Sequence, residues 1–77
     1  MKKLIPEELM EILKIIKDAK HKGTLINRGK IGTKLNITKP TLKKRVDILL
    51  ELHYITSKEK GNNRYLLLTD LGNSIMS

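Results

Sequence analysis

The sequence contains no cysteine, phenylalanine or tryptophan, and only two tyrosines, Tyr54 and Tyr65. The absence of cysteine excludes disulfide frameworks and thiolate metal sites. His21 and His53 lie too far apart for a ligand spacing such as H-x-x-x-H, so we predict no metal and no other cofactor. The scarcity of aromatic rings also disfavours binding of RNA or single-stranded DNA, which relies on stacking platforms.

No apolar run approaches the roughly 20 residues that a membrane-spanning helix needs. Pro6, Glu7, Glu8 and Glu11 interrupt the apolar residues near the N-terminus, so a signal-peptide core is lacking. We therefore expect a cytoplasmic protein without a membrane partner. The sequence also has no carboxylate pair, Ser/His/Asp arrangement or phosphate-binding glycine loop, and we predict that it is not an enzyme.

Positive charge is the most informative property that is present. The net charge is +8, and residues 20 to 64 hold twelve Lys or Arg against three acids. A local excess of this kind attracts polyanions, of which nucleic acid is the usual one. The alternative is a lysine-rich surface that only aids solubility. A length of 77 residues with 39% hydrophobic residues predicts a single domain, residues 1–77, with one core.

The clearest element is a helix over residues 6 to 22. Pro6 suits the first helical position, and Gly23 suits the end. Between them, apolar residues recur at helical spacing: Leu9, Ile12, Leu13, Ile16 and Ala19. The next residues, 24 to 26, are β-prone but few, and we expect them to pair at a sheet edge.

Two further helices are predicted over residues 28–35 and 39–52. Asn27 is a suitable N-cap for the first and Thr38 for the second. Gly32 lies on the inner face of the first helix, where the lack of a side chain would let another helix approach closely. Ile31, Leu35, Ile37, Leu42 and Val46 are expected to face inward and lock the two helices together.

The C-terminal third is predicted to form a hairpin followed by a short helix. Residues 54–58 and 64–68 are β-prone and flank a Gly/Asn turn over 59–63. Thr69 or Asp70 can cap a last helix that carries Leu71, Ile75 and Met76. The expected fold is mainly α with a small β-hairpin (α+β), in the order helix, short strand, helix, helix, hairpin, helix.

The predicted second and third helices form a helix-turn-helix unit whose outer face is cationic. A helix of about 10–12 Å fits the major groove of B-DNA, and its N-terminus favours phosphate. The hairpin tip, residues 58 to 64, can lie along the backbone or enter the minor groove. The predicted DNA-binding residues are Arg28, Thr38, Lys39, Thr41, Lys43, Lys44, Arg45, Lys58, Lys60, Asn62, Asn63 and Arg64, with Asn27 as a further phosphate donor. The alternative for residues 39–52 is an amphipathic helix with a solvated lysine face.

In these segments the sequence resembles winged helix-turn-helix domains of MarR- and ArsR-like regulators. The similar stretches are residues 31–38, residues 46–55 and residues 64–72, the last of which contains the Leu-Thr-x-x-Gly pattern that often follows the wing. The resemblance covers residues 7 to 76. It implies that helix 39–52 enters the major groove, that the hairpin is the wing, and that the protein regulates transcription as a homodimer.

The sequence departs from this family in two respects. His53 stands where such regulators often have glycine before the first wing strand; we interpret it as a residue at the negative end of the helix, with pH sensing as the alternative. The chain also lacks the extra helices that build effector pockets, so no small-molecule effector is predicted.

A homodimer is predicted from apolar side chains on the first and last helices. Leu4, Met10 and Ile15 flank the inner stripe of the first helix, and the last helix adds its own apolar residues. The alternative is that these residues cover the domain's own core. For function as a whole, the alternative to DNA binding is a winged-helix module that binds proteins within a nucleic-acid-processing assembly.

Overall fold

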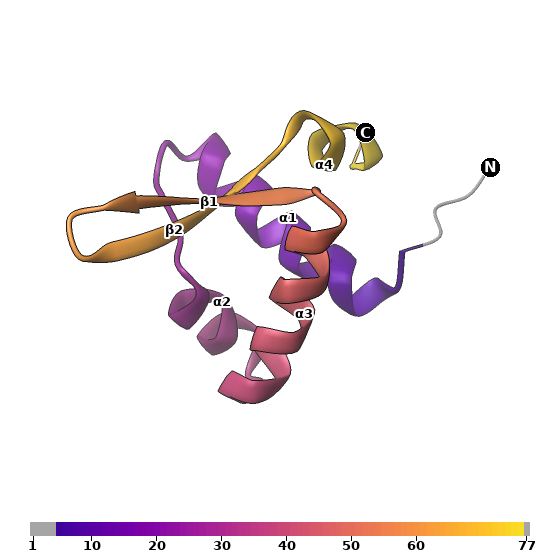
Figure 1. Cartoon of the computed structure of the whole chain (residues 1–77), viewed down its shortest axis with the longest axis horizontal. Coiled ribbons are helices and arrows are strands. Elements are labelled where there is room, and N and C mark those ends of the chain that lie inside the picture. Colours follow the sequence, from indigo (N-terminus) through magenta and orange to yellow (C-terminus); the bar gives the residue numbers. More distant parts are fainter. Residues whose placement is uncertain (1–4, 77) are drawn as a thin grey trace.

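The computed structural model describes residues 5–76, which form four helices and one antiparallel pair of strands (Figure 1). In chain order the elements are α1 (Glu7–His21), α2 (Arg28–Leu35), α3 (Lys39–Glu51), β1 (Ile55–Lys60), β2 (Asn63–Leu68) and α4 (Asp70–Ile75). This order confirms the predicted α+β class. Residues 1–4 and 77 lie outside the described part, and so does the predicted role of Leu4.

The core lies between the first three helices and the base of the hairpin. Helix α1 contributes Leu9, Ile12, Leu13, Ile16 and Ala19, the five residues that the periodicity predicts. The other buried apolar residues are Ile26, Ile31, Leu42, Val46, Leu49, Ile55 and Leu66. The core therefore joins all three helices to both strands, and the order of elements follows from burying these faces together.

Both ends of α1 are fixed by backbone hydrogen bonds. At the start, the carbonyl of Pro6 accepts from the amides of Leu9 and Met10, so Pro6 is the N-cap and not the first helical residue. At the end, Gly23 has φ +75° and the amide of Thr24 donates to Ala19 O at 2.9 Å. These are the features of a glycine-terminated helix.

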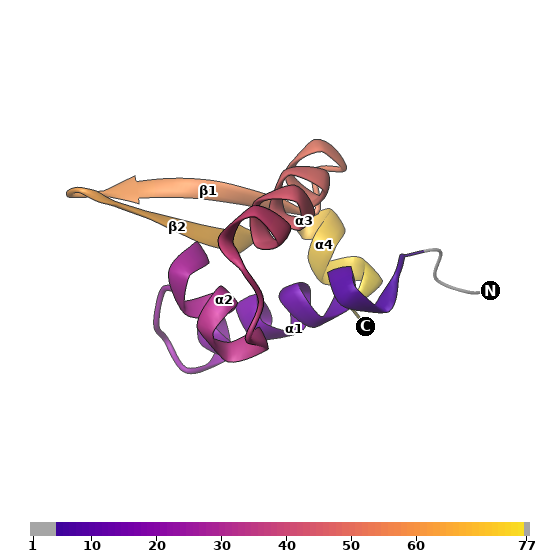
Figure 2. The same cartoon turned by 90° about the horizontal axis from the view of Figure 1, so that it is seen from below.

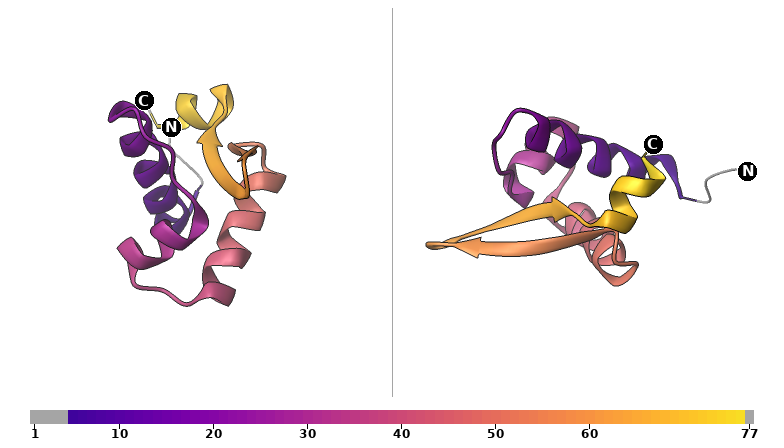
Figure 3. Two further views of the ribbon diagram at one scale, coloured as in Figure 1. Left: turned by 90° about the vertical axis from the view of Figure 1, so that its left-hand side faces the viewer. Right: turned by 90° about the horizontal axis from the view of Figure 1, so that it is seen from above.

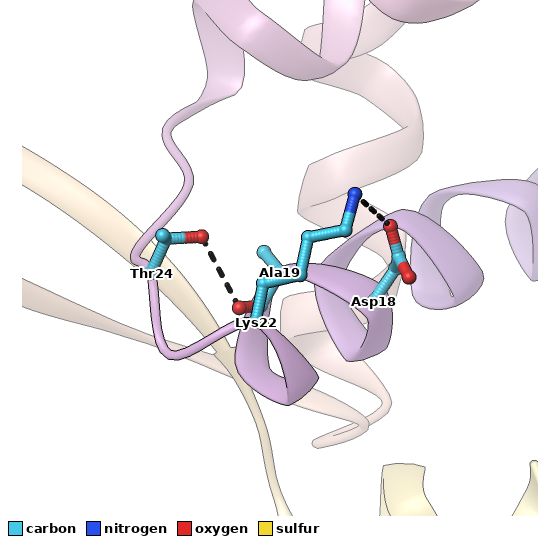
Figure 4. A network of polar contacts seen from close by, with 4 residues as sticks. All are labelled: Asp18, Ala19, Lys22 and Thr24. Carbon is cyan, nitrogen blue, oxygen red and sulfur yellow. Dashed lines mark hydrogen bonds and ion pairs between the residues drawn. The ribbon is translucent and has the colours of Figure 1, made fainter.

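Side chains reinforce the end of α1 (Figure 4). The Thr24 hydroxyl donates to the same Ala19 carbonyl at 3.2 Å, and Lys22 Nζ lies 3.2 Å from Asp18 Oδ2. The following segment runs toward the sheet, where the Leu66 amide donates to Ile26 O at 2.9 Å. The predicted edge strand at 24–26 is thus reduced to a single bridge between Ile26 and Leu66.

Helices α2 and α3 meet closely at Gly32. A Cβ at Gly32 would lie 3.2 Å from Leu42 Cδ2 of α3, which is tighter than most such contacts and confirms the predicted close approach. Asn27 caps α2 as predicted, since its Oδ1 accepts from the Lys30 amide at 2.9 Å. Asn36 ends α2 in the left-handed conformation, with φ 57°, which asparagine tolerates better than most residues.

Helix α3 ends one residue earlier than predicted, at Glu51. Thr38 occupies the N-cap position, but its side chain makes no hydrogen bond to the helix backbone. His53 lies beyond the helix with φ 64°, while its amide donates to Leu50 O and that of Tyr54 donates to Leu49 O. This left-handed residue turns the chain into β1, and glycine is the residue that adopts such a conformation most readily.

The hairpin is longer and its turn shorter than predicted. Glu59 lies opposite Arg64 and Lys60 opposite Asn63, so only Gly61 and Asn62 connect the strands. Gly61 has φ +63°, and glycine at the first central position is typical of a type II′ hairpin turn. The hairpin projects well beyond the helices (Figures 2 and 3), and β1 is exposed from Thr56 to its end.

Helix α4 packs against the end of the hairpin. Thr69 is its N-cap, because its Oγ1 accepts from the Gly72 amide at 3.0 Å. A Cβ at Gly72 would collide with the carbonyl oxygen of Tyr54, so a side chain here would require the backbone to shift. No helix within residues 5–76 has the length and hydrophobicity to cross a bilayer.

Candidate nucleic-acid interface

The outer face of α3 is exposed and mainly cationic. Leu42, Val46 and Leu49 bury the inner face of the helix. The exposed residues of its outer face include Lys39, Pro40, Lys43, Lys44 and Asp47. Of the predicted inward residues, Leu35 and Ile37 are half-buried and packed against the core. The helix thus offers charged side chains to solvent while its other side holds the domain together.

Arg28, the first residue of α2, links this face to the hairpin. It borders a shallow hollow with Lys39, Leu42 and Lys43. It also borders a second hollow with the tip of the hairpin, whose lining residues are Glu59, Gly61, Asn62, Asn63 and Arg64. One arginine therefore borders both hollows, one with the start of α3 and one with the hairpin tip, and so adjoins residues from three separate segments of the sequence.

The hairpin tip is exposed over its whole length, residues 58 to 64. Lys58, Lys60 and Arg64 are its cations. Arg64 Nη2 lies 3.2 Å from Glu59 Oε2, its partner directly across the two strands. Both side chains are more than 60% exposed. An exposed pair of this kind contributes about 0.2–1 kcal/mol, so Arg64 can exchange Glu59 for a phosphate.

A second ion pair lies on the outer face of α3. Lys43 Nζ is 3.1 Å from Asp47 Oδ2, one helical turn further along. At the start of the same helix, the hydroxyl of Thr38 donates to that of Thr41 at 3.0 Å. These two predicted contact residues therefore hydrogen-bond to each other, and the carboxamide oxygen of Asn27 is already used as the cap of α2.

Arg45 does not join the other predicted residues on the outer face. It is half-buried, and it lies about 160° around the helix from Asp47 at 100° per residue. Its neighbours in that direction are Ile48 and Thr41. Arg45 is thus at the flank of the surface formed by Arg28, Lys39, Lys43, Lys44 and the hairpin tip, which we call the cationic surface.

The two carboxylates of this surface are functional candidates that the sequence reasoning missed. Asp47 follows Lys43 by four residues, and this i, i+4 spacing on one helix face is the signal in the sequence for their pairing. The Glu59–Arg64 pair was hidden because residues 59–63 were all assigned to the turn. Once both residues are placed in strands, the register sets them opposite each other.

The comparisons with known proteins show similarity in fold. No protein-family model matches the sequence, and no curated protein is significantly similar to it. The structure is similar to that of AF1382 from Archaeoglobus fulgidus, with a TM-score of 0.81 and 24% identity over 94% of this chain and 79% of that one. It is also similar to the transcriptional repressor BigR from Xylella fastidiosa, with a TM-score of 0.69 and 16% identity over 95% of this chain and 66% of the repressor.

The chain has a winged-helix fold. In this fold α2 and α3 are the helix-turn-helix unit, and the hairpin of β1 and β2 is the wing. The predicted architecture is confirmed, whereas the assignment to the MarR- or ArsR-like type stays a prediction. The cationic surface comprises the second helix of the unit, the start of the first helix and the tip of the wing.

Proposed function

We propose that this protein binds double-stranded DNA in a sequence-specific manner and regulates transcription. Helix α3 lies in the major groove, and the wing tip contacts the backbone or the minor groove. The observation that carries the proposal is the position of Arg28, which borders one hollow with Lys39 and Lys43 and another with the wing tip. Cations from three elements thereby line two hollows that adjoin at Arg28, an arrangement that suits a polyanionic rod.

Each part of the surface has a distinct task in this proposal. Lys43 and Lys44 lie on the exposed side of α3 and reach base edges or phosphates in the major groove. Arg28 contacts the backbone beside the groove. Lys58, Lys60, Asn62, Asn63 and Arg64 follow the backbone or insert into a narrow minor groove, to which arginine is suited. Thr38, Lys39 and Thr41 at the start of α3 donate to phosphate, and Arg45 contacts the backbone at the flank.

The similarity to the repressor BigR supports a regulatory role, and a homodimer that reads two half-sites remains part of the proposal. The described apolar residues of α1 predicted to join it, Met10 and Ile15, are half-buried against the chain's own core, as are Ile75 and Met76. Leu71 is 50% exposed. A dimer contact would therefore rest on α4 more than on α1.

A second candidate function, a protein-interaction module, is favoured by one observation. Ile48 and Leu52, one turn apart on α3, are 46% and 45% exposed. Exposed apolar residues at this spacing suit a protein contact. Ile48 is in the second half of α3 and Leu52 is its C-cap. Both lie beyond the cationic half of the helix, so this surface can also serve a partner while the protein is on DNA.

The proposal is tested by gel-shift titration of duplex and single-stranded oligonucleotides of random sequence at two salt concentrations. We expect tighter binding to duplex and a steep loss of affinity as salt rises, because phosphate contacts release counterions. The matched variant Lys44→Ala should weaken duplex binding, whereas Lys14→Ala on the exposed face of α1 should not. Equal binding to both strand forms, or affinity independent of salt, would overturn the proposal.

A further inference from the structure

Two acids lie within the cationic surface, and their positions differ. Glu59 is on the wing, opposite Arg64. Asp47 is on α3, and its side chain is 54% exposed beside that of Lys43, which is 65% exposed. A carboxylate among cations that meet phosphates weakens binding to DNA through repulsion. Helix α3 has two exposed acids, Asp47 and, at its last position, Glu51. Asp47 is the acid that lies beside Lys43, and it therefore calls for a role that its charge does not oppose.

The placement of Asp47 on α3 suggests that role. At 100° per residue it lies between Lys43 and Lys44, within about 60° of each, so it shares the direction of the outward lysines. A side chain in this direction faces the floor of the major groove when the helix occupies it. Base edges in the groove carry amino groups, and these are the hydrogen-bond donors in DNA that a carboxylate can accept from.

We propose that Asp47 is a specificity-determining residue that accepts a hydrogen bond from the N4 amino group of a cytosine. This inference rests on the proposed function. Cytosine is favoured over adenine because adenine places the N7 acceptor beside its amino group, and that acceptor repels a carboxylate, whereas cytosine presents only the donor. The negative charge of Asp47, which repels phosphates, thereby serves to select one base.

Lys43 completes the recognition of the same base pair or its neighbour. Its ammonium group is 3.1 Å from Asp47, and its remaining donors suit the O6 and N7 acceptors of guanine. The two side chains thus match the two halves of a G·C pair. Their contact in the protein alone places the ammonium group and the carboxylate side by side before DNA binds.

The wing supplies a matched control for the charge of Asp47. Glu59 is likewise exposed, likewise paired with a cation at 3.2 Å, and part of the same surface. It lies on the wing and not on α3. Glu59→Gln removes the same charge as Asp47→Asn, so the effect of charge is separated from the effect of base recognition.

The experiment is selection of bound duplexes from a randomised library by the wild type, Asp47→Asn, Asp47→Ala and Glu59→Gln. Binding constants are then measured on duplexes that differ at one base pair. For the wild type we expect a required G·C pair, with about tenfold or greater loss on its replacement. Asp47→Asn should shift the preference at that position toward adenine, and Asp47→Ala should remove it. Glu59→Gln should raise affinity for all duplexes alike.

Two results would overturn the inference, and they are distinguishable. If the wild type selects a sequence and Asp47→Asn only raises affinity uniformly, as Glu59→Gln does, then Asp47 reads no base while the proposed function stands. If the wild type binds no duplex, the proposed function fails and the inference fails with it. Circular dichroism spectra of the variants serve as the control that the exposed substitutions leave the fold intact.

Discussion

The hydroxyl of Thr69 donates to the carbonyl of His53 at 2.6 Å and accepts from the amide of Gly72 at 3.0 Å. One side chain therefore joins the end of α3, the end of the wing and the start of α4. The Thr69 amide adds a bond to Tyr54 O at 3.1 Å. This junction holds the base of the wing at a fixed angle to α3, and so places the wing tip relative to the helix that is proposed to enter the groove.

Replacing Thr69 by valine should lower the free energy of unfolding by about 1–2 kcal/mol. Valine keeps the shape of the side chain but removes the hydroxyl, so Gly72 N and His53 O lose their partner. Thr69→Ser retains the hydroxyl and should lower the free energy of unfolding much less. Urea denaturation of the three proteins measures the difference, and equal stabilities of the valine and serine variants would contradict this account of the junction.

Gly72→Ala should destabilise the protein by about 3 kcal/mol or prevent folding, because overpacking against backbone cannot be relieved by a side-chain rotation. The added Cβ would meet Tyr54 O at 2.0 Å. The matched control is Gly29→Ala in α2, where the nearest atom is 3.4 Å away. That substitution should be neutral or slightly stabilising. Thermal unfolding followed by circular dichroism separates the two, and similar melting temperatures would refute the close contact.

His53→Gly should stabilise the protein by about 0.5–1 kcal/mol, since relief of the left-handed conformation outweighs the greater entropy of glycine in the unfolded chain. The expected gain in stability rests on the φ of 64° that this exposed residue adopts. Chemical denaturation measures the gain. His53→Ala should show none of it, because alanine bears the same strain; a loss of stability in the glycine variant would mean that the imidazole itself supports the fold.

Much of the fold is predictable from the sequence because burial imposes periodicity. The apolar spacing of α1 identifies its five buried residues, and Gly32 indicates the close contact with α3. The ends of elements are less predictable, since they depend on backbone geometry. The wing strands extend to Lys60 and Asn63 through cross-strand hydrogen bonds that no local preference reveals, and the need for glycine at position 72 arises from Tyr54, distant in sequence.

The sequence predicts which residues belong to the candidate site better than it predicts how they are arranged in space. Charge and helical periodicity select the exposed cations of α3 and the wing. They do not reveal that Arg28 lies between these two elements, which follows from how α2 packs. Helical periodicity does separate Arg45 from the outward lysines, because it lies about 160° from Asp47, and its half-buried position agrees with this.

Lys60→Ala and Arg64→Ala should each reduce the slope of log affinity against log salt by about 1, with a similar loss on every duplex sequence. Both residues are on the exposed wing tip and are proposed to contact phosphates. Lys43→Ala should instead cost about 1–3 kcal/mol on the preferred sequence and less on others. Fluorescence anisotropy at several salt concentrations measures both effects, and a sequence-dependent loss in a wing variant would place that side chain in the minor groove and not on the backbone.

The most direct test of the cationic surface is to follow the backbone amides of the isotope-labelled protein by NMR while a duplex is added. The account predicts that the signals that shift belong to Arg28, Lys39, residues 41 to 47 and residues 58 to 64, while those of the exposed side of α1 around Lys14 stay in place. Shifts concentrated on α1, or none in α3 and the wing at saturating duplex, would contradict it.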